Sequence, residues 1–382
     1  MKKTKIFAIV PSGFCFGLQF ITIDFFRNFT KIDSLFLLTK WSDGMFKKSL
    51  NENSIPYTES WLGFISKSLK TEYVKMTIHG TSKLPLLYYH FLRTYYRFKP
   101  EALYFANRQE LILLYPVLKL FAKVPVLCHL HDPPPPTPFQ KRSFRFYDKL
   151  VTHYISISDD VRDRALMLGM NASKITTIHN GIEIKQTDYE NLIFREKWSE
   201  ESIIIGITGQ MTETKGHLDL LEAFILARKI DQRLKLLIGS KPIEPLYTKL
   251  KKRIAEENIA DFVQFTGWLD ESKTFYDNID MLVLASRHDE GFGLVVAEAM
   301  SYRKVVIATK SGGAKEIIIN KESGFLIEKG DISALKDCIL HASENNMDLV
   351  RNNAYNRIDN HFNISIQSKK LEDFIIKFAN KC

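Results

Sequence analysis

Residues 281–299 read MLVLASRHDEGFGLVVAEA and divide into three parts. The run Met281–Ala285 is apolar throughout, which predicts a short buried strand. Gly291 and Gly293 follow in a turn, where the lack of a side chain lets backbone amides approach a ligand closely. A helix then begins near Leu294, and its N-terminus offers free N–H groups and a positive dipole end. A strand, a glycine turn and a helix in this order favour the binding of a diphosphate.

The same alternation extends on both sides of this element. In the second half, strands are expected at 202–208, 234–239, 262–266 and 305–308, and a helix at 216–229. In the first half, strands are expected at 5–10, 34–38, 102–106 and 124–130, and a helix at 18–29. Short runs rich in Val, Ile, Leu and Phe are typical of parallel strands covered on both faces. The alternation predicts an α/β fold with two Rossmann-like, doubly wound domains that face a central cleft.

The polar segment Lys185–Glu200 lies between the two patterns and predicts the join. We therefore expect one domain over residues 1–190 and a second over residues 191–382. The second domain ends in helices that can pack back on the first. They are expected at 332–343, 347–360 and 365–379.

Composition excludes several classes of protein. The chain has 382 residues, of which 45% are hydrophobic and 25% charged, as in globular proteins of two ordinary domains. Its four cysteines have no short spacing, which argues against a zinc site or a disulfide framework. The first apolar run, 6–10, is too short for a signal peptide, and no later run could span a bilayer. We expect a cytoplasmic protein, peripheral at the inner face of the membrane if it associates with one.

Positive charge is concentrated in the first half. Residues 1–195 hold 27 Lys and Arg against 16 Asp and Glu, a net of +11. This suggests an anionic partner, such as a membrane surface or a lipid diphosphate, although a solvated basic surface is the alternative. The segment Leu84–Lys99 mixes Tyr, Phe, Arg and Lys, as an interfacial helix or a core stripe would. It also suits RNA, but no fold signature for nucleic-acid binding accompanies it, so nucleic acid is not an expected partner.

Three groups of polar residues follow expected strands. Glu290 and Glu298 lie eight residues apart. They can reach the two ends of one nucleotide sugar, the sugar and the nucleoside. Lys215 ends the loop 209–216 and can place an ammonium on a diphosphate. His131 follows the run 124–130 at the end of a strand, where open α/β sheets bind ligands; His129 is more simply a structural histidine. Taken singly, each is also compatible with an ordinary surface or core residue.

Together these residues resemble the family-4 retaining glycosyltransferases of the two-domain GT-B class. The resemblance covers nearly the whole chain and is strongest in its second half. It lies in the order of the motifs, since His-Asp at 131–132, Asn-Gly-Ile-Glu at 180–183, Lys-Gly at 215–216 and the glutamates at 290 and 298 follow one another as in the family. The segment 156–161 and the glycine turns at 311–313 and 323–325 are also similar.

The resemblance implies an acceptor-binding domain at 1–190, a domain that binds the nucleotide-sugar donor at 191–382, and a role for each matching residue. Glu298 would hold the ribose hydroxyls, Glu290 would contact the transferred sugar, and His131 would lie near the reacting carbon. The catalytic pair is then His131 and Glu290. The donor-binding residues would be Gln210, Lys215, Gly291, Phe292, Gly293, Leu294, Val295 and Glu298. No metal or other cofactor is expected, because Lys215 and a helix N-terminus would supply the positive charge that a metal ion otherwise provides. The chain also contains no Asp-x-Asp triplet.

Two positions depart from the family pattern. Gln210 stands where the family often has arginine, as in a subset of its members. The acceptor-side loop holds Gly13 and Gly17 instead of a Gly-Gly pair, with Phe14 and Phe16 between them.

The expected function is transfer of a sugar, with retention, from a nucleotide-diphosphate sugar to a saccharide or lipid-linked saccharide in bacterial surface polysaccharide synthesis. A nucleotide-sugar epimerase of related fold and a catalytically inactive nucleotide- or glycan-binding partner are the alternatives.

Overall fold

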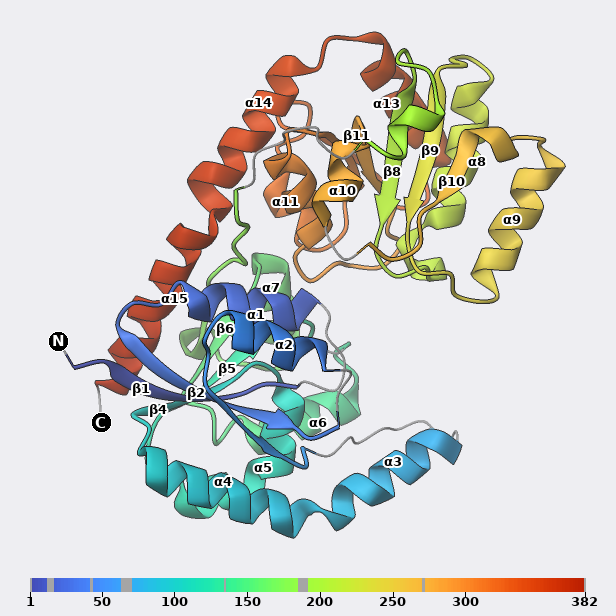
Figure 1. The fold of residues 1–382 in the computed structure, drawn as a ribbon. Helices are drawn as coiled ribbons and strands as arrows, with labels where there is room; N and C mark the ends of the chain where they lie inside the picture. Colours follow the sequence, from blue (N-terminus) through green and yellow to red (C-terminus); the bar gives the residue numbers. More distant parts are fainter. Residues whose placement is uncertain are drawn as a thin grey trace. The chain divides into compact units, whose positions relative to one another are not determined.

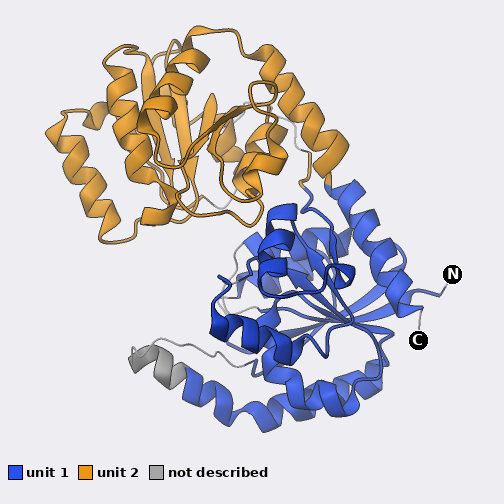
Figure 2. Cartoon of the chain, turned by 180° about the vertical axis from the view of Figure 1, so that it is seen from behind, with its two compact units in different colours: residues 1–181, 364–382 blue, residues 182–363 orange. Residues whose placement is uncertain are grey.

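The computed structural model describes residues 2–11, 17–41, 44–62, 71–133, 135–184, 192–269 and 272–380. It divides into two compact units (Figure 2). The first unit takes residues 1–181 together with 364–382, and the second takes residues 182–363. The chain therefore passes between the units twice, near Gly181 and near Asn363.

Parallel strands form a seven-stranded sheet in the described part of the first unit, in the order β3-β2-β1-β4-β5-β6-β7. The strands are β1 Thr4–Ile9, β2 Ile32–Thr39, β3 Tyr57–Ser60, β4 Ala102–Phe105, β5 Val126–Leu130, β6 His153–Ser156 and β7 Ile175–Thr177. The order reverses between β1 and β4, the point where open α/β sheets form a ligand crevice.

Helices cover both faces of this sheet, with α1, α2 and α15 on one side and α4 and α5 on the other (Figure 1). The helices are α1 Gly17–Arg27, α2 Met45–Glu52, α3 Thr71–Ser82, α4 Leu84–Phe98, α5 Arg108–Phe121, α6 Pro138–Tyr147, α7 Asp159–Met167 and α15 Ile364–Ala379. A short 3-10 turn occupies Ala172–Lys174.

The second unit contains a six-stranded parallel sheet in its described residues, in the order β10-β9-β8-β11-β12-β13. The strands are β8 Ile203–Thr208, β9 Leu234–Gly239, β10 Val263–Phe265, β11 Met281–Leu284, β12 Val305–Thr309 and β13 Phe325–Ile327. Here the order reverses between β8 and β11, so the loops after these two strands flank the crevice.

The helices of the second unit are α8 His217–Arg228, α9 Leu246–Glu256, α10 Ser272–Asp277, α11 Leu294–Ser301, α12 Ala314–Ile317, α13 Ile332–Glu344 and α14 Asp348–Arg357. Helical turns also occupy Arg195–Lys197, Glu213–Lys215, Ala260–Phe262 and Ile358–Phe362. The sheet is covered on both faces, which explains why its strands are apolar without alternation. The predicted class of two Rossmann-like α/β units is confirmed.

The last helix, α15, belongs to the first unit. Its Leu371 and Ile375 join the core beneath α1. The buried Glu372 carboxylate accepts the backbone N–H groups of Thr30 and Lys31, at 2.7 and 2.5 Å. We expected this helix in the second domain, residues 191–382, but it belongs to the first unit. The same expectation allowed C-terminal helices to pack back on the first domain.

Helix α4 buries one face and exposes the other. Leu87, Phe91 and Tyr95, spaced four apart, are buried, and Phe91 stacks on Phe7 of β1 at 5.5 Å between ring centroids. On the outer side the exposed fractions of Tyr89 and Tyr96 are 58% and 57%. The inner face of this segment is thus part of the core, and an interfacial role for its outer face stays a prediction. In the described residues no helix combines the length and the apolarity needed to cross a membrane.

Candidate donor and acceptor sites

Two loops meet at the crevice of the second unit. The loop after β8 carries residues 209–216, and the loop after β11 carries residues 285–293. The Thr214 carbonyl accepts the Ser286 hydroxyl at 3.1 Å and the Arg287 backbone N–H at 2.8 Å. Gly216 has φ +73°, and a Cβ there would lie 1.9 Å from the Ala285 carbonyl oxygen. Glycine is required at this position because the two loops approach so closely.

This contact brings Lys215 and Glu290 together. The Lys215 ammonium donates to both carboxylate oxygens of Glu290, at 2.7 and 2.8 Å. The two side chains are partly buried, with exposed fractions of 31% and 16%. The ammonium of Lys215 can bind a negatively charged part of a ligand, and the carboxylate of Glu290 beside it can accept hydrogen bonds from hydroxyl groups of the same ligand.

Helix α11 points its N-terminus at the same crevice. Gly293 precedes it with φ +99°, and no side chain caps the helix. Within the described residues, the backbone N–H groups of Leu294 and Val295 have no hydrogen-bond partner. Two free N–H groups at the positive end of a helix dipole are suited to an anion such as phosphate.

Glu298 lies one turn further along α11 and is positioned by a buried tyrosine. The Tyr276 hydroxyl donates to Glu298 Oε2 at 2.8 Å, and only 1% of Tyr276 is exposed. Tyr302 stacks on Tyr276 with 4.9 Å between ring centroids. Burial, followed by the nearby Glu298 carboxylate, raises the pKa of Tyr276 well above its usual value. Tyr276 therefore stays protonated and acts as a donor to Glu298.

The loop after β12 packs against the loop that carries Asp289 and Glu290. The Gly313 N–H donates to the Glu290 carbonyl at 3.0 Å, and the Gly312 N–H donates to Asp289 Oδ1 at 3.0 Å. A Cβ on Gly312 would lie 1.8 Å from the Glu290 carbonyl oxygen. The glycine turn at 311–313, noticed in the sequence only as a resemblance, thus has a packing role.

Gln210 and the neighbouring glycine lie on the open side of the loop after β8. The Gln210 side chain is exposed, and Gly209 has φ +123° with open space around it. Met211, which follows, is fully buried and anchors the loop. Gln210 is therefore free to contact a ligand but is not held in place by its neighbours.

Sequence reasoning did not identify several supporting residues of this site. Arg287 forms a bidentate ion pair with the buried Asp219, at 2.7 and 2.5 Å. His217 is 1% exposed, and its Nε2 lies 3.0 Å from Ser240 Oγ. His217 directly follows the Lys-Gly motif and Arg287 lies three residues before Glu290, so their positions beside the two motifs were the available signal. For Tyr276 no local signal existed.

In the first unit, His131 follows β5 as predicted. Its side chain is half-buried, and its Nε2 is enclosed without a hydrogen-bond partner among the described residues. Burial lowers the pKa of His131 to about 3. The ring is therefore neutral at ordinary pH and can donate or accept a hydrogen bond, but it carries no charge.

His129 lies deeper than His131. It is 1% exposed, and its Nδ1 lies 2.5 Å from the Tyr104 hydroxyl. The rings of His129 and His131 are 4.6 Å apart between centroids. Burial, then the neighbouring His131, lowers the pKa of His129 well below its usual value. Its packing and its hydrogen bond are those of a core residue.

Other predicted positions of the first unit are less informative. Asp132 is exposed and accepts Arg164 Nη1 at 2.9 Å. Gly17 is the exposed first residue of α1. Gly13, the other acceptor-side glycine, lies outside the described residues. The site roles given to these positions stay predictions.

Sequence comparisons identify the family. The model of the glycosyl transferases group 1 matches residues 188–360, and that of glycosyltransferase family 4 matches residues 70–186. The chain belongs to this GT-B family of group 1 and family-4 glycosyltransferases. The boundary between the two models, at 186–188, lies close to the residue where the compact units change.

Curated relatives are similar over part of their length. The capsular polysaccharide biosynthesis glycosyltransferase CapM of Staphylococcus aureus is 28% identical over 60% of this chain and 63% of its own. The amylovoran biosynthesis glycosyltransferase AmsK of Erwinia amylovora is 26% identical over 56% and 54%. An uncharacterized glycosyltransferase of Methanocaldococcus jannaschii is 34% identical over 51% and 49%. The matched part of the chain thus spans less than two thirds of each of these relatives.

Solved structures share the fold over almost the whole chain. Anabaena HepE in complex with UDP superimposes with a TM-score of 0.81 and 20% identity, covering 98% of this chain and 100% of its own. The sucrose-phosphate synthase of Thermosynechococcus elongatus gives a TM-score of 0.74 at 16% identity, covering 98% and 100%. At such identities the likeness shows the fold alone.

Proposed function

We propose that this protein transfers a sugar, with retention of configuration, from a nucleotide-diphosphate sugar to a saccharide or lipid-linked saccharide in bacterial surface polysaccharide synthesis. The observation that carries the proposal is the cluster of polar groups that follows β8 and β11 in the second unit. There Lys215, Glu290, the N-terminus of α11 and Glu298 lie on adjoining loops and one helix. Each group matches one part of such a donor.

The diphosphate would bind at the cationic side of the crevice. Lys215 supplies a full positive charge, and the N–H groups of Leu294 and Val295 supply donors at a helix N-terminus. The N–H groups of Gly291, Phe292 and Gly293 belong to the same turn. These groups stabilise the charge that develops on the departing diphosphate, which is where electrostatic catalysis acts in such a transfer. We therefore expect no metal ion to be required.

The two glutamates would contact the parts of the donor on either side of the diphosphate, namely the transferred sugar and the ribose. Glu290 is held beside Lys215, so its carboxylate lies next to the diphosphate position and can accept hydroxyls of the transferred sugar. Glu298 is held one turn along the helix by Tyr276 and can accept the ribose hydroxyls. Exposed Gln210 would contact the diphosphate as a neutral donor.

His131 is proposed to contact the reacting sugar from the first unit. Its neutral ring has an enclosed nitrogen without a partner among the described residues, and such a group gains from a hydrogen bond to a sugar hydroxyl. The acceptor would bind in the same unit, with the turn at Gly13 and Gly17 as its loop.

Relatives favour transfer over the alternatives. Curated relatives named for capsular polysaccharide and amylovoran biosynthesis are glycosyltransferases, and Anabaena HepE has been solved with UDP-glucose. An epimerase would convert the nucleotide sugar without using an acceptor, and a catalytically inactive partner would convert no substrate. Incubating the purified protein with UDP-, GDP- and ADP-sugars and candidate acceptors, and measuring acceptor-dependent free nucleotide, separates transfer from both alternatives. Failure to form any glycosylated product with every donor that binds would reject transferase activity.

We further propose that the protein works in the cytoplasm and associates peripherally with an anionic membrane. Helix α4 supports this, because its exposed Tyr89 and Tyr96 accompany Arg93 and Arg97 on a chain half with a net charge of +11. Electrostatic attraction is screened over about 10 Å at 0.1 M salt and about 3 Å at 1 M. Co-sedimentation with anionic vesicles should therefore fall at high salt, and equal sedimentation with neutral and anionic vesicles would reject the proposal.

A further inference from the structure

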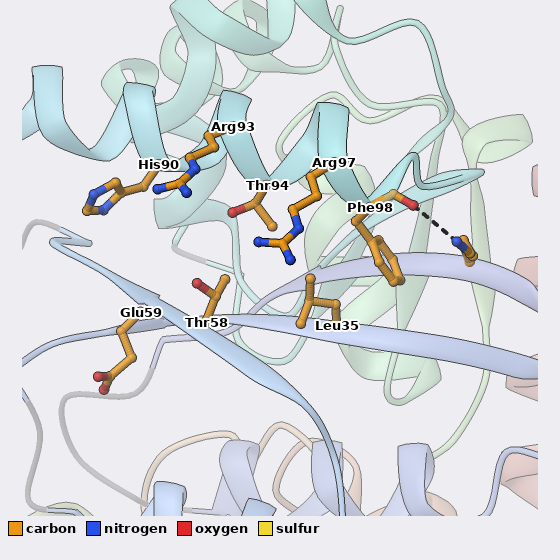
Figure 3. A pocket seen from close by; sticks show the side chains of 9 residues that line it. Leu35, Thr58, Glu59, His90, Arg93, Thr94, Arg97 and Phe98 are labelled. Atoms are coloured by element: carbon orange, nitrogen blue, oxygen red, sulfur yellow. Dashed lines mark hydrogen bonds between the residues drawn. The ribbon is translucent and has the colours of Figure 1, made fainter.

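A groove of about 450 Å³ lies in the first unit between α4 and the edge of the sheet formed by β1, β2 and β3 (Figure 3). Leu35 of β2 and Thr58 of β3 form its floor, and Arg93, Thr94 and Arg97 of α4 form its roof. It extends past the edge strand β3 towards the amino end of β1. His131, by contrast, lies at the carboxyl end of β5. The groove is therefore separate from His131, the residue proposed to contact the reacting sugar.

Two guanidinium groups face this groove. Arg93 and Arg97 lie one helical turn apart, and both point from α4 towards the strand residues Thr58 and Leu35 (Figure 3). Neither forms an ion pair with any of the residues that the structure describes. Like charges four residues apart on a helix repel each other. An anion between the two groups would remove that repulsion and can accept two N–H bonds from each guanidinium.

The other charged groups of the lining do not neutralise the arginines. Glu59 already forms an ion pair with Lys47. Lys5 donates to the Phe98 carbonyl at 3.5 Å and adds a third positive charge. Burial, then the positive charges of Lys40 and Arg93, lowers the pKa of His90, whose Nδ1 lies 3.1 Å from the Ser60 hydroxyl. The groove is thus positively charged at neutral pH.

The remaining lining indicates what the anion is attached to. The hydroxyls of Thr58 and Thr94 have no hydrogen-bond partner in the described part of the chain and can donate to oxygen. Leu35 and Phe98 offer apolar surface beside them. A volume of about 450 Å³ is within the range of sites for small organic molecules, about 300–1,000 Å³, and exceeds the needs of a bare anion.

We propose that this groove binds the phosphate of a phosphate ester, with Arg93 and Arg97 as its ligands and the organic body resting against Leu35 and Phe98. A soluble phosphate ester and a phospholipid headgroup share this chemistry. The site is distinct from the diphosphate position at Lys215. Its soluble-ester arm does not depend on the proposed function, whereas its headgroup arm rests on the membrane association proposed above.

Calorimetric titration of the full chain with glycerol 3-phosphate tests the proposal, because this ester is soluble and also matches a lipid headgroup. Vesicles of phosphatidylcholine with and without phosphatidylglycerol form a second arm. The variant Arg93→Gln/Arg97→Gln should lose at least tenfold in affinity for whichever probe binds. Lys141→Gln/Arg142→Gln removes two exposed positive charges from the same unit and should bind as the wild type does.

Two further variants separate the groove from general electrostatics and from the donor site. Leu35→Trp fills the groove while both arginines remain, and it should abolish binding of the ester. Lys215→Ala should leave the binding of glycerol 3-phosphate unchanged. Melting temperatures within a few degrees of the wild type would show that each variant is folded.

Every outcome decides the question. Binding of the soluble ester that the arginine pair and Leu35→Trp both abolish supports a soluble ligand. Binding confined to anionic vesicles, with the same losses, supports a headgroup. Absence of binding in both arms, or equal losses in the Lys141→Gln/Arg142→Gln control, would overturn the proposal.

Discussion

Lys215 and Glu290 are 75 residues apart in the chain, yet the Lys215 ammonium lies within 2.7 and 2.8 Å of the two Glu290 carboxylate oxygens. The pair exists because β8 and β11 are neighbours in the sheet, so the loops that follow them meet. A diphosphate at this position would share the ammonium with Glu290. The carboxylate and the ammonium should therefore make separable contributions to donor binding and to transfer.

The first prediction separates these contributions. Lys215→Met should weaken binding of the nucleoside diphosphate about 10- to 100-fold, since losing a charged hydrogen-bond partner costs about 1.5–3 kcal/mol. Glu290→Gln should change that affinity only a few-fold but reduce kcat strongly, because its contact is with the sugar. Calorimetry with the nucleoside diphosphate and steady-state kinetics measure the two effects.

A matched control is available in the same unit. Lys310 forms an exposed ion pair with Glu328, and Lys310→Met should leave nucleotide affinity unchanged. If Lys215→Met also binds normally, the ammonium has no part in holding the diphosphate.

The second prediction concerns Glu298 and Tyr276. Glu298→Ala should weaken donor binding about 10- to 100-fold with the fold intact. Tyr276→Phe removes the hydrogen bonds to Glu298 and to the Val295 carbonyl, and it should raise the donor KM a few-fold, because Glu298 loses the donor that orients it but keeps its charge. Glu256→Ala, on the exposed side of α9, is the control. Normal donor affinity in Glu298→Ala would remove Glu298 from the site.

The third prediction is that activity survives EDTA. Lys215 and the α11 N-terminus supply positive charge where a metal would otherwise act. Initial rates with and without EDTA measure this. Complete loss of transfer, restored by magnesium or manganese, would show that the charge is supplied by a metal.

The fourth prediction is a loss of stability in acid caused by His217. Burial, then Lys215, lowers the pKa of His217 to about 4, against an ordinary 6.5. Between these values the unfolded chain binds a proton that the folded chain does not, so stability falls as the pH falls through this window. Between pH 7 and pH 5 the loss should be about 2 kcal/mol for this group.

Urea unfolding at pH 7 and pH 5 measures the loss. His217→Gln should lose less stability over this interval than the wild type, whereas His341→Gln, at an exposed position, should lose as much. Parallel pH profiles for the wild type and His217→Gln would contradict the assignment to this residue.

The features that the sequence predicted are those that depend on local pattern. Apolar runs such as 281–284 became strands because a doubly wound sheet buries both faces, and the glycine turn at Gly291 and Gly293 precedes a helix as expected. By contrast, β3, β6, β7 and β13 were not predicted. They are only three or four residues long, and β3 and β6 contain polar residues.

The features that could not be predicted depend on contacts distant in sequence. Tyr276 holds Glu298 across 22 residues, because α10 packs beside α11. Glu372 joins α15 to the first unit through Thr30, across 342 residues, and no pattern in the last helix indicates that contact. The sequence gives the positions of Glu298 and Glu372 along the chain, but it does not indicate their hydrogen-bond partners.

The last prediction distinguishes His131 from His129, two residues apart on the same sheet edge. His129 packs in the core and bonds to Tyr104, so His129→Ala should leave a cavity and an unpaired hydroxyl, lowering the free energy of unfolding by about 2–4 kcal/mol. His131 has an enclosed Nε2 that bonds to no described residue, so His131→Ala should change stability less. If its hydrogen bond to the sugar strengthens in the transition state, kcat should fall about 10- to 100-fold and the donor KM should change little.

Since the pKa of His131 lies near 3, the activity of the wild type should show no titration of this ring between pH 5 and 8. Steady-state kinetics on both variants, beside their melting temperatures, give the answer. A well-folded but inactive His129→Ala, together with near-normal kcat in His131→Ala, would reverse the two roles.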